Sequence, residues 1–177
     1  MDKAQFWQLI EEAKEKSGGE CEAQVDLIEE ALLRLSAEEV IAFDRLVDIF
    51  RDQAYRWDLW GAASLINGGC SDDCFMYFGC WLIAQGQEVF ENALRDPDSL
   101  SEIIEPDFAD AECEALLYVG GRVYKNKTGQ EMPEEAISAE KMAAAQLEPA
   151  GPRGTRWEED ELDALFPRIA AKIAVEE

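Results

Sequence analysis

Apolar residues recur at intervals of three and four along most of this chain, and this period constrains the fold more than any other feature. One such stripe consists of Cys21, Val25, Ile28, Leu32 and Leu35. Acidic residues occupy the other face of the same segment, as in an amphipathic helix that covers an apolar core. No stretch of convincing length alternates between apolar and polar residues as a strand does. The sequence therefore predicts an all-α fold.

Start and stop signals divide the chain into about six or seven helices. Ser36 followed by Glu39 forms the pattern of a capping box, and the pair Gly68-Gly69 is typical of a helix end. We predict helices over residues 6–17, 21–35, 37–55, 57–66, 71–94, 111–124 and, at the C-terminal end, within 157–175.

Three of these segments carry predictions about the architecture. The helix over 71–94 has the broadest apolar surface, so we expect it at the centre, with Gly86 permitting a bend or a close crossing. Residues 130–156 are poorly patterned and contain prolines and glycines, which favours a surface loop or linker. The helix within 157–175 is expected to dock back onto the body. Residues 1–177 then form one helical domain.

The charge of the chain limits its partners. With 39 acidic and 16 basic residues, the 177-residue chain has a formal net charge of −23. A field of that sign repels phosphates, so direct binding to nucleic acid and adsorption to anionic lipid are disfavoured. The excess charge is explained either by a highly soluble surface or by mimicry of nucleic-acid charge toward a basic protein partner.

Location and thiol state follow from two further observations. The sequence has no run of about 18 apolar residues and no basic-then-apolar leader, so we expect a cytoplasmic protein without a membrane span. Five cysteines are an odd number without the spacing of a disulfide framework, which favours reduced thiols. They are Cys21, Cys70, Cys74, Cys80 and Cys113.

The stretch WDLWGAASLINGGCSDDCF, residues 57–75, holds the candidate functional residues. They are Trp57, Asp58, Trp60, Asn67, Asp72 and Asp73. One interpretation is a turn between helices, in which Gly68 takes the left-handed conformation and Ser71 caps the next helix. The two aspartates would then lie in the first turn of that helix, where the dipole favours negative charge and where they would repel a phosphate.

The other interpretation of this stretch is a ligand pocket. On a helix, Trp57 and Trp60 share a face and Asp58 lies about 100° around from Trp57. Aromatic walls with carboxylates suit a cationic or sugar-like small molecule. In the competing account both tryptophans are core residues and Asp58 accepts an indole N–H or pairs with Arg51 or Arg56.

The sequence contains few of the residue types that usually support catalysis. The chain has no histidine, which excludes histidine-dependent triads and histidine metal sites. Carboxylates such as Asp72 and Asp73 could bind a hard cation or act as acid and base, but adjacent residues of one helix diverge by about 100°. Cys70 and Cys74 lack the further ligands of a zinc site. We predict no catalytic residue, metal or cofactor.

Four motifs make the sequence similar to a known family: FWxLI at residues 6–10, WDLWxAAxLINGGCSDDxF at 57–75, WLIxxG at 81–86 and DPDSL at 96–100. They resemble the bacterial, largely actinobacterial, domain-of-unknown-function family 4240, and the likeness extends to the C-terminal Trp157 and Arg168. The resemblance implies one cytoplasmic whole-chain domain and no established activity. The family commonly carries an arginine where this chain has Gly79; if that arginine contacts Asp72 and Asp73 in the family, the pair is missing here.

The sequence favours a non-catalytic interaction or regulatory module that acts through a macromolecular partner, since acidic surface is abundant and catalytic apparatus is not. The alternative is a small-molecule-binding protein or carboxylate-dependent enzyme with its pocket around residues 57–73. Tryptophans that line an open concavity would support the alternative. Buried tryptophans and capping aspartates would support the interaction module.

Overall fold

The fold is built from helices throughout the described part of the chain. The computed structural model describes residues 1–105, 110–133 and 151–174, and within them it contains nine α-helices, two 3-10 helices and no strand. The prediction of an all-α protein is confirmed. The elements are α1 (Lys3–Ser17), α2 (Cys21–Leu32), α3 (Ala37–Ala54), α4 (Trp57–Ile66), α5 (Asp72–Ala84), α6 (Gln87–Arg95), η1 (Pro97–Glu102), α7 (Glu114–Thr128), η2 (Glu159–Glu161), α9 (Leu162–Leu165) and α10 (Pro167–Ile173).

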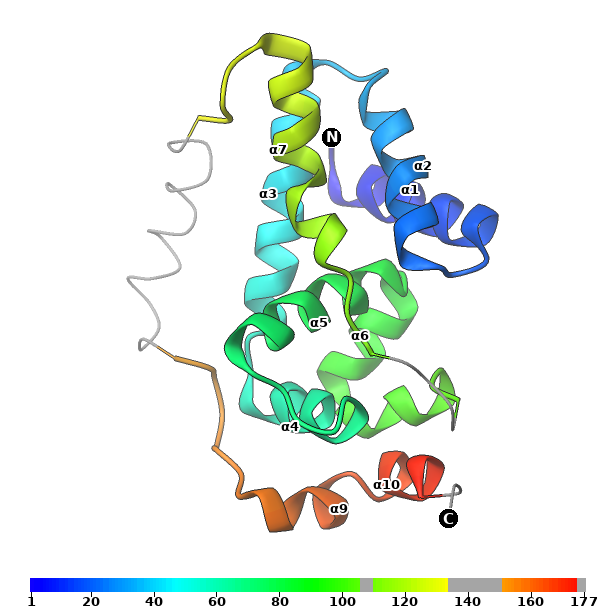
Figure 1. The fold of residues 1–177 in the computed structure, drawn as a ribbon, viewed down its shortest axis with the longest axis vertical. Coiled ribbons are helices and arrows are strands. Elements are labelled where there is room, and N and C mark those ends of the chain that lie inside the picture. The colour runs from blue at the N-terminus through cyan, green and yellow to red at the C-terminus, as the bar shows by residue number, and fades with distance from the viewer. Residues whose placement is uncertain (106–109, 134–150, 175–177) are drawn as a thin grey trace.

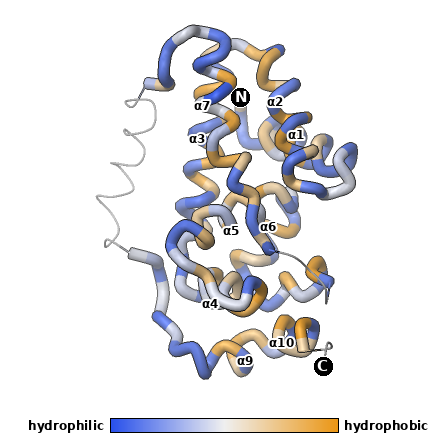
Figure 2. Tube along the Cα trace, viewed as in Figure 1, coloured by the Kyte–Doolittle hydropathy of each residue, from blue (hydrophilic) through white to orange (hydrophobic). Residues whose placement is uncertain are grey.

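Helix α5 lies at the centre of the molecule. It packs against α1, α2, α3, α4, α6 and α7, and in Figure 1 it crosses between an upper group that contains α1, α2 and α7 and a lower group that contains α4, α9 and α10. Figure 2 shows hydrophilic and hydrophobic residues alternating along α2, α3 and α7, as expected for helices with one buried face. The predicted central position of this segment is confirmed.

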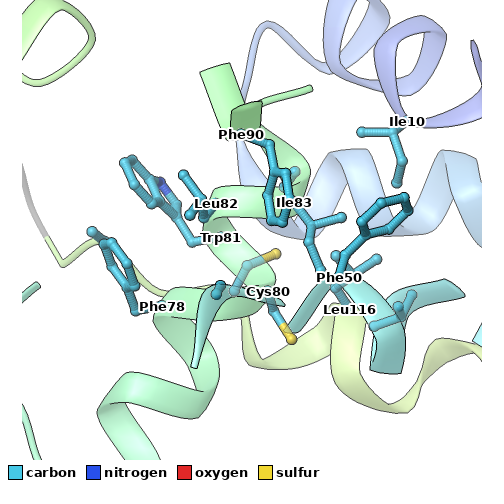
Figure 3. Packing of buried hydrophobic residues seen from close by; sticks show 14 of the residues in the cluster. Ile10, Phe50, Phe78, Cys80, Trp81, Leu82, Ile83, Phe90 and Leu116 are labelled. Atoms are coloured by element: carbon cyan, nitrogen blue, oxygen red, sulfur yellow. The ribbon is translucent and has the colours of Figure 1, made fainter. Parts of the chain in front are cut away.

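The apolar core surrounds α5 on more than one side. In Figure 3, Phe78 and Trp81 project to one side of the helix, while Ile83 points toward Phe50 on the other. All four side chains are at most 6% exposed, and burial of a large apolar side chain contributes roughly 1.5–3 kcal/mol. The core therefore holds α5 in position, which matters because its N-terminal turn carries the candidate residues.

The predicted helix over residues 71–94 is two helices. Helix α5 ends at Ala84, and α6 begins after Gly86, whose φ of 92° is a left-handed value that favours glycine. We expected Gly86 to allow a bend, but the run of helical hydrogen bonds is interrupted there and the two helices are separate. The break lets Phe90 of α6 pack against Trp7 of α1, with ring centroids 5.5 Å apart.

The C-terminal segment packs against α4 and η1. Trp157 donates its indole N–H to the Trp57 carbonyl at 2.7 Å, and Phe166 and Ile169 are buried. Gly61 of α4 accommodates this contact, since a Cβ there would lie 2.8 Å from the Phe166 ring. The one predicted C-terminal helix is divided into α9 and α10, because Phe166 precedes a proline and leaves the helical conformation.

The described residues do not test two of the sequence-based predictions. The loop or linker predicted over 130–156 falls largely on residues 134–150, which lie outside the described residues. The assignment of the whole chain to one domain stays a prediction. No helix within the described ranges is both long enough and apolar enough to span a bilayer.

Four of the five cysteines form disulfides, so the prediction of reduced thiols is wrong for them. Cys21 bonds to Cys113 and Cys70 bonds to Cys74, while Cys80 is a buried free thiol. The Cα atoms of the bonded pairs are 5.8 and 5.2 Å apart, within the range that a disulfide requires. The odd number of cysteines was misleading because the fifth cysteine, Cys80, is a buried core residue and the other four form two pairs. The first pair joins the starts of α2 and α7, a proximity that only the packing creates.

Candidate functional site

The turn between α4 and α5 has the predicted geometry. Gly68 and Gly69 have φ values of 66° and 122°, and the Ser71 hydroxyl accepts the Cys74 backbone N–H at 3.2 Å. Asp72 and Asp73 are exposed in the first turn of α5. The chain therefore reverses between two helices as the turn interpretation expects, and the backbone N–H groups of α5 stabilise the carboxylates.

The two predicted tryptophans of α4 are packing residues. Trp60 is 9% exposed, and its indole N–H donates to the Cys70 carbonyl at 2.9 Å. Its ring stacks on Phe75, with centroids 4.6 Å apart, and on Trp57 at 5.4 Å. Trp57 is half-buried and is flanked by Trp157 of the C-terminal segment. The indoles thus contact protein groups and form no open aromatic wall.

Asp58 has a structural partner that the sequence analysis named. It forms an ion pair with Arg56, whose Nε lies 3.0 Å from Oδ1, and it accepts the Leu59 backbone N–H at 2.8 Å. The same arginine donates to the Leu94 carbonyl at 2.8 Å, near the end of α6. Asp58 therefore orients the guanidinium that connects the start of α4 to α6.

Asn67 joins the turn to the segment that precedes α7. Its Oδ1 accepts the Ala111 backbone N–H at 2.8 Å, and its Nδ2 donates to the Cys74 sulfur at 3.4 Å. The six predicted residues consequently do not surround one pocket. Of these six, the structure places Asp72 and Asp73 in the wall of a cleft, and the cleft faces α3 instead of the α4 tryptophans.

Replacing Asn67 by alanine tests its structural role. The Ala111 N–H loses its acceptor in this variant, and a half-buried donor without a partner costs about 1–3 kcal/mol. We expect the free energy of unfolding in urea to fall by that amount. Asn67→Asp keeps an acceptor oxygen and is expected to lose less. Equal losses in the two variants would contradict this account.

A cleft of about 430 Å³ lies between α3 and the N-terminal turn of α5. Its walls combine acidic groups with an apolar lining. Tyr55 stands at its edge with 39% of its surface exposed, and the Tyr55 ring centroid lies 6.0 Å from that of Phe75. The lining residues are Asp48, Arg51, Asp52, Ala54, Tyr55, Asp72, Asp73, Phe75, Met76 and Gly79.

The charges of the cleft do not cancel. Among the described residues that line it, four are aspartates and one is an arginine. Arg51 pairs with Asp48 at 3.3 Å, and Arg153 reaches in from the C-terminal segment to pair with Asp52 at 3.3 Å. In the described part of the chain Asp72 and Asp73 form no ion pair. Among the described residues, the cleft thus presents two carboxylates without a cationic partner.

Gly79 leaves space on the α5 side of the cleft. A Cβ at this position would meet the Cγ of Arg51 at 3.5 Å, which is an ordinary van der Waals contact. A longer side chain would therefore enter the cleft above Arg51. Because the α5 backbone is helical here, a substitution tests occupancy of the cleft without requiring an unusual backbone conformation.

Two further titratable groups of α5 have raised pKa values. Burial raises the pKa of the Cys80 thiol to about 12, so that it is not a nucleophile at neutral pH. A hydrogen bond to Glu114 raises the pKa of Tyr77 to about 12. Within the described ranges no group of three or more cysteine, aspartate or glutamate side chains is arranged to hold a metal ion.

Sequence reasoning missed the α3 side of this cleft. Asp48 and Asp52 are four residues apart on one helix, so the sequence places them on a common face. That spacing was the available signal. Nothing local indicated that the face lies opposite Asp72 and Asp73, which follow 20 and more residues later.

Comparison with known proteins identifies a family without a known activity. No similar chain was found among curated proteins or among solved structures. The model of one protein family matches residues 1–126, which comprise α1 to α6, η1 and most of α7, together with the entire cleft. The chain therefore belongs to the family of proteins of unknown function DUF4240.

Proposed function

We propose that this protein is a non-catalytic interaction module that binds a basic protein partner and accepts a lysine or arginine side chain of that partner between α3 and α5. The observation that carries the proposal is the unbalanced charge of the cleft. Its described lining has four aspartates against one arginine, and two of the aspartates form no ion pair in the described part of the chain.

The other lining groups suit a long basic side chain. Phe75, Met76 and Ala54 offer apolar contact to the methylene groups that lysine and arginine carry. Tyr55, which is 39% exposed and lines the cleft, supplies an aromatic ring of the kind that attracts a cation. Asp72 and Asp73 supply acceptors for the charged end, and hydrogen bonds between ionised groups are stronger than neutral ones.

The charge of the whole chain supports the same kind of partner. A net charge of −23 attracts basic molecules over a distance and increases the rate of encounter. The same field repels nucleic acid and anionic lipid, which are not proposed as direct partners. The tryptophans of α4 are buried or half-buried, which favours the interaction module over a pocket at residues 57–73.

Peptide binding by fluorescence anisotropy tests the proposal. The probes are a short labelled peptide rich in lysine and arginine and a matched peptide with glutamine in their place. We expect the basic peptide alone to bind, with affinity that falls steeply between low and moderate salt. Asp72→Asn/Asp73→Asn is expected to weaken binding roughly tenfold, since each exposed ion pair contributes up to about 1 kcal/mol.

Three further variants distinguish binding in the cleft from attraction by the overall negative charge. Glu159→Gln/Asp160→Asn makes the same change of charge at two exposed residues of η2, and we expect it to keep most of the affinity. Gly79→Arg places a guanidinium in the cleft and is expected to abolish binding, while Gly79→Ala retains it. Equal weakening by both double variants would refute a specific cleft.

Competition with a polyamine distinguishes a protein partner from a small-molecule ligand. Spermidine offers the same ammonium groups as a basic peptide without a protein partner. If the protein is the interaction module proposed here, the peptide binds more tightly than spermidine. Tighter binding of spermidine would overturn the proposal in favour of a small-molecule-binding protein that uses the same aspartates.

The location of the protein stays a prediction. The expected cytoplasmic location came from the lack of an apolar span and of a leader, and the expected reduced thiols agreed with it, whereas the two disulfides do not. Stable structural disulfides are typical of oxidising compartments, whereas disulfides of cytosolic proteins are usually transient. Mapping the thiols of the protein in its native cells would decide between the two environments.

A further inference from the structure

The two disulfides of this protein have different surroundings. The Cys21–Cys113 bond joins residues 92 positions apart, and Cys113 is 2% exposed. The Cys70–Cys74 bond joins residues four positions apart in the turn before α5. Both of its cysteines are half-exposed, and the neighbouring Gly69 and Ser71 are exposed. Cys21 is partly buried as well, so a thiol in solution can approach either sulfur of the second bond but the first bond only at Cys21.

The turn before α5 does not depend on its disulfide. The Ser71 hydroxyl caps α5, the Trp60 indole N–H donates to the Cys70 backbone carbonyl, and the side-chain Oδ1 of Asn67 accepts the Ala111 N–H. A bond that closes so short a loop also constrains the unfolded chain far less than one that closes a long loop. Opening the Cys70–Cys74 bond thus leaves the groups that position the turn in place.

The two sulfurs of the pair differ in how well each would carry negative charge. Cys74 is the third residue of α5, near the positive end of the helix dipole, and the Asn67 amide donates to its sulfur at 3.4 Å. Cys70 lies outside the helix. The charges of Asp72 and Asp73 act against a thiolate at either sulfur, so the amide and the dipole set the difference.

We propose that Cys70–Cys74 is a redox-active disulfide that exchanges with dithiols, with Cys74 as the leaving group. A thiolate of the dithiol attacks the Cys70 sulfur, a mixed disulfide forms, and the Cys70–Cys74 bond breaks to leave the electron pair on the Cys74 sulfur. The second thiolate of the dithiol then attacks the first sulfur of the same dithiol, which is bonded to Cys70 in the mixed disulfide. This step oxidises the dithiol to a disulfide and releases Cys70 as a thiolate. The dithiol is oxidised by two electrons and the cysteine pair is reduced.

The acidic surroundings limit the kind of dithiol that reacts. Asp72 and Asp73 separate Cys70 from Cys74 along the chain and are both exposed. They repel a negatively charged thiol and favour a neutral or basic one. The reductant class is therefore a neutral small dithiol or a protein dithiol within a basic surface. This inference does not depend on the proposed binding of a basic side chain in the cleft.

Selective reduction of the folded protein tests the proposal, and the Cys21–Cys113 bond in the same molecule serves as the control. The oxidised protein is exposed to dithiothreitol for increasing times, its thiols are blocked with a maleimide, and each pair is quantified by peptide mass spectrometry. We expect Cys70–Cys74 to open more than tenfold faster, on the order of a hundredfold, with unchanged helical circular dichroism. Equal rates, or loss of helicity as the bond opens, would overturn the proposal.

Single-cysteine variants test which sulfur leaves. Cys70→Ser leaves the Cys74 thiol, Cys74→Ser leaves the Cys70 thiol, and Cys80 does not interfere because it is buried. The rate of alkylation by neutral iodoacetamide against pH measures each pKa. We expect a lower pKa for Cys74 than for Cys70, and a smaller difference when Asn67→Ala is added to Cys70→Ser. The opposite order would refute Cys74 as the leaving group.

Discussion

Replacing Asp98 by alanine is expected to lower the free energy of unfolding by about 2–3 kcal/mol, because two backbone N–H groups at the start of α10, one of them buried, lose their acceptor. Asp98 is 7% exposed and lies at the start of η1. Its Oδ2 accepts the backbone N–H and the Nε–H of Arg168 at 3.0 and 3.1 Å. Its Oδ1 accepts the Ile169 N–H at 2.9 Å. The variant leaves the first N–H groups of α10 and a guanidinium without this acceptor.

Urea unfolding followed by tryptophan fluorescence measures the effect of Asp98→Ala. Asp163→Ala removes an exposed aspartate from the neighbouring helix α9 and serves as the matched control, with an expected change within about 0.5 kcal/mol. Asp98→Asn keeps one acceptor oxygen and is expected to fall between the two. A loss below about 1 kcal/mol in Asp98→Ala would show that Asp98 does not hold the C-terminal segment in place.

Removing the long-range disulfide with Cys21→Ser/Cys113→Ser is expected to cost about 4–5 kcal/mol by the loop-entropy relation. The reason is that the bond closes a loop between residues 92 positions apart, so the unfolded chain gains much freedom when it is absent. The serine hydroxyl at position 113 adds to the loss, because Cys113 is 2% exposed.

Thermal and urea unfolding under oxidising conditions measure the loss. Cys70→Ser/Cys74→Ser is the matched control, with an expected cost of roughly 2 kcal/mol, because its loop spans only four positions. Circular dichroism first establishes that each variant is helical. A larger cost for the Cys70 and Cys74 variant than for the Cys21 and Cys113 variant would contradict the assigned roles of the two bonds.

The elements that the sequence predicts well have local causes. The Ser36 capping box forms as expected, with the Ser36 hydroxyl accepting the Glu39 N–H at 3.2 Å and the Glu39 carboxylate accepting the Ser36 N–H at 2.9 Å. Ser71 caps α5 in the same way, and Gly129 ends α7 with a φ of 72°. A cap or a glycine end depends on neighbouring residues alone, so the printed sequence contains the necessary information.

The two predictions that were wrong have different causes. The helix over 71–94 was predicted as continuous because its apolar pattern continues through Gly86, and the left-handed backbone there leaves no mark on that pattern. The cysteines were predicted as thiols because spacing along the chain does not show that Cys21 and Cys113 lie side by side. The first error gave a local glycine too little weight against the apolar pattern, whereas the second arises because periodicity describes one segment at a time.

The candidate site also combines features that the local sequence predicts with features that depend on packing. The sequence singled out Asp72 and Asp73 correctly as exposed acids at a helix start. It grouped them with Trp57 and Trp60, which are near in the chain, whereas the structure groups them with Asp48 and the rest of the α3 wall. Proximity along the chain was a poor guide here, since the turn directs the α4 tryptophans toward Phe75 and the C-terminal segment.

The sequence by itself determined that this protein is all-α, where most of its helices begin and end, and that its net charge is strongly negative. Each of these properties follows from the pattern within one segment or from a sum of charges. Only the tertiary structure decided which acids share the cleft, which cysteines bond and which tryptophans are buried. The reason is that these depend on how helices cross, and many different crossings bury the same apolar stripes equally well.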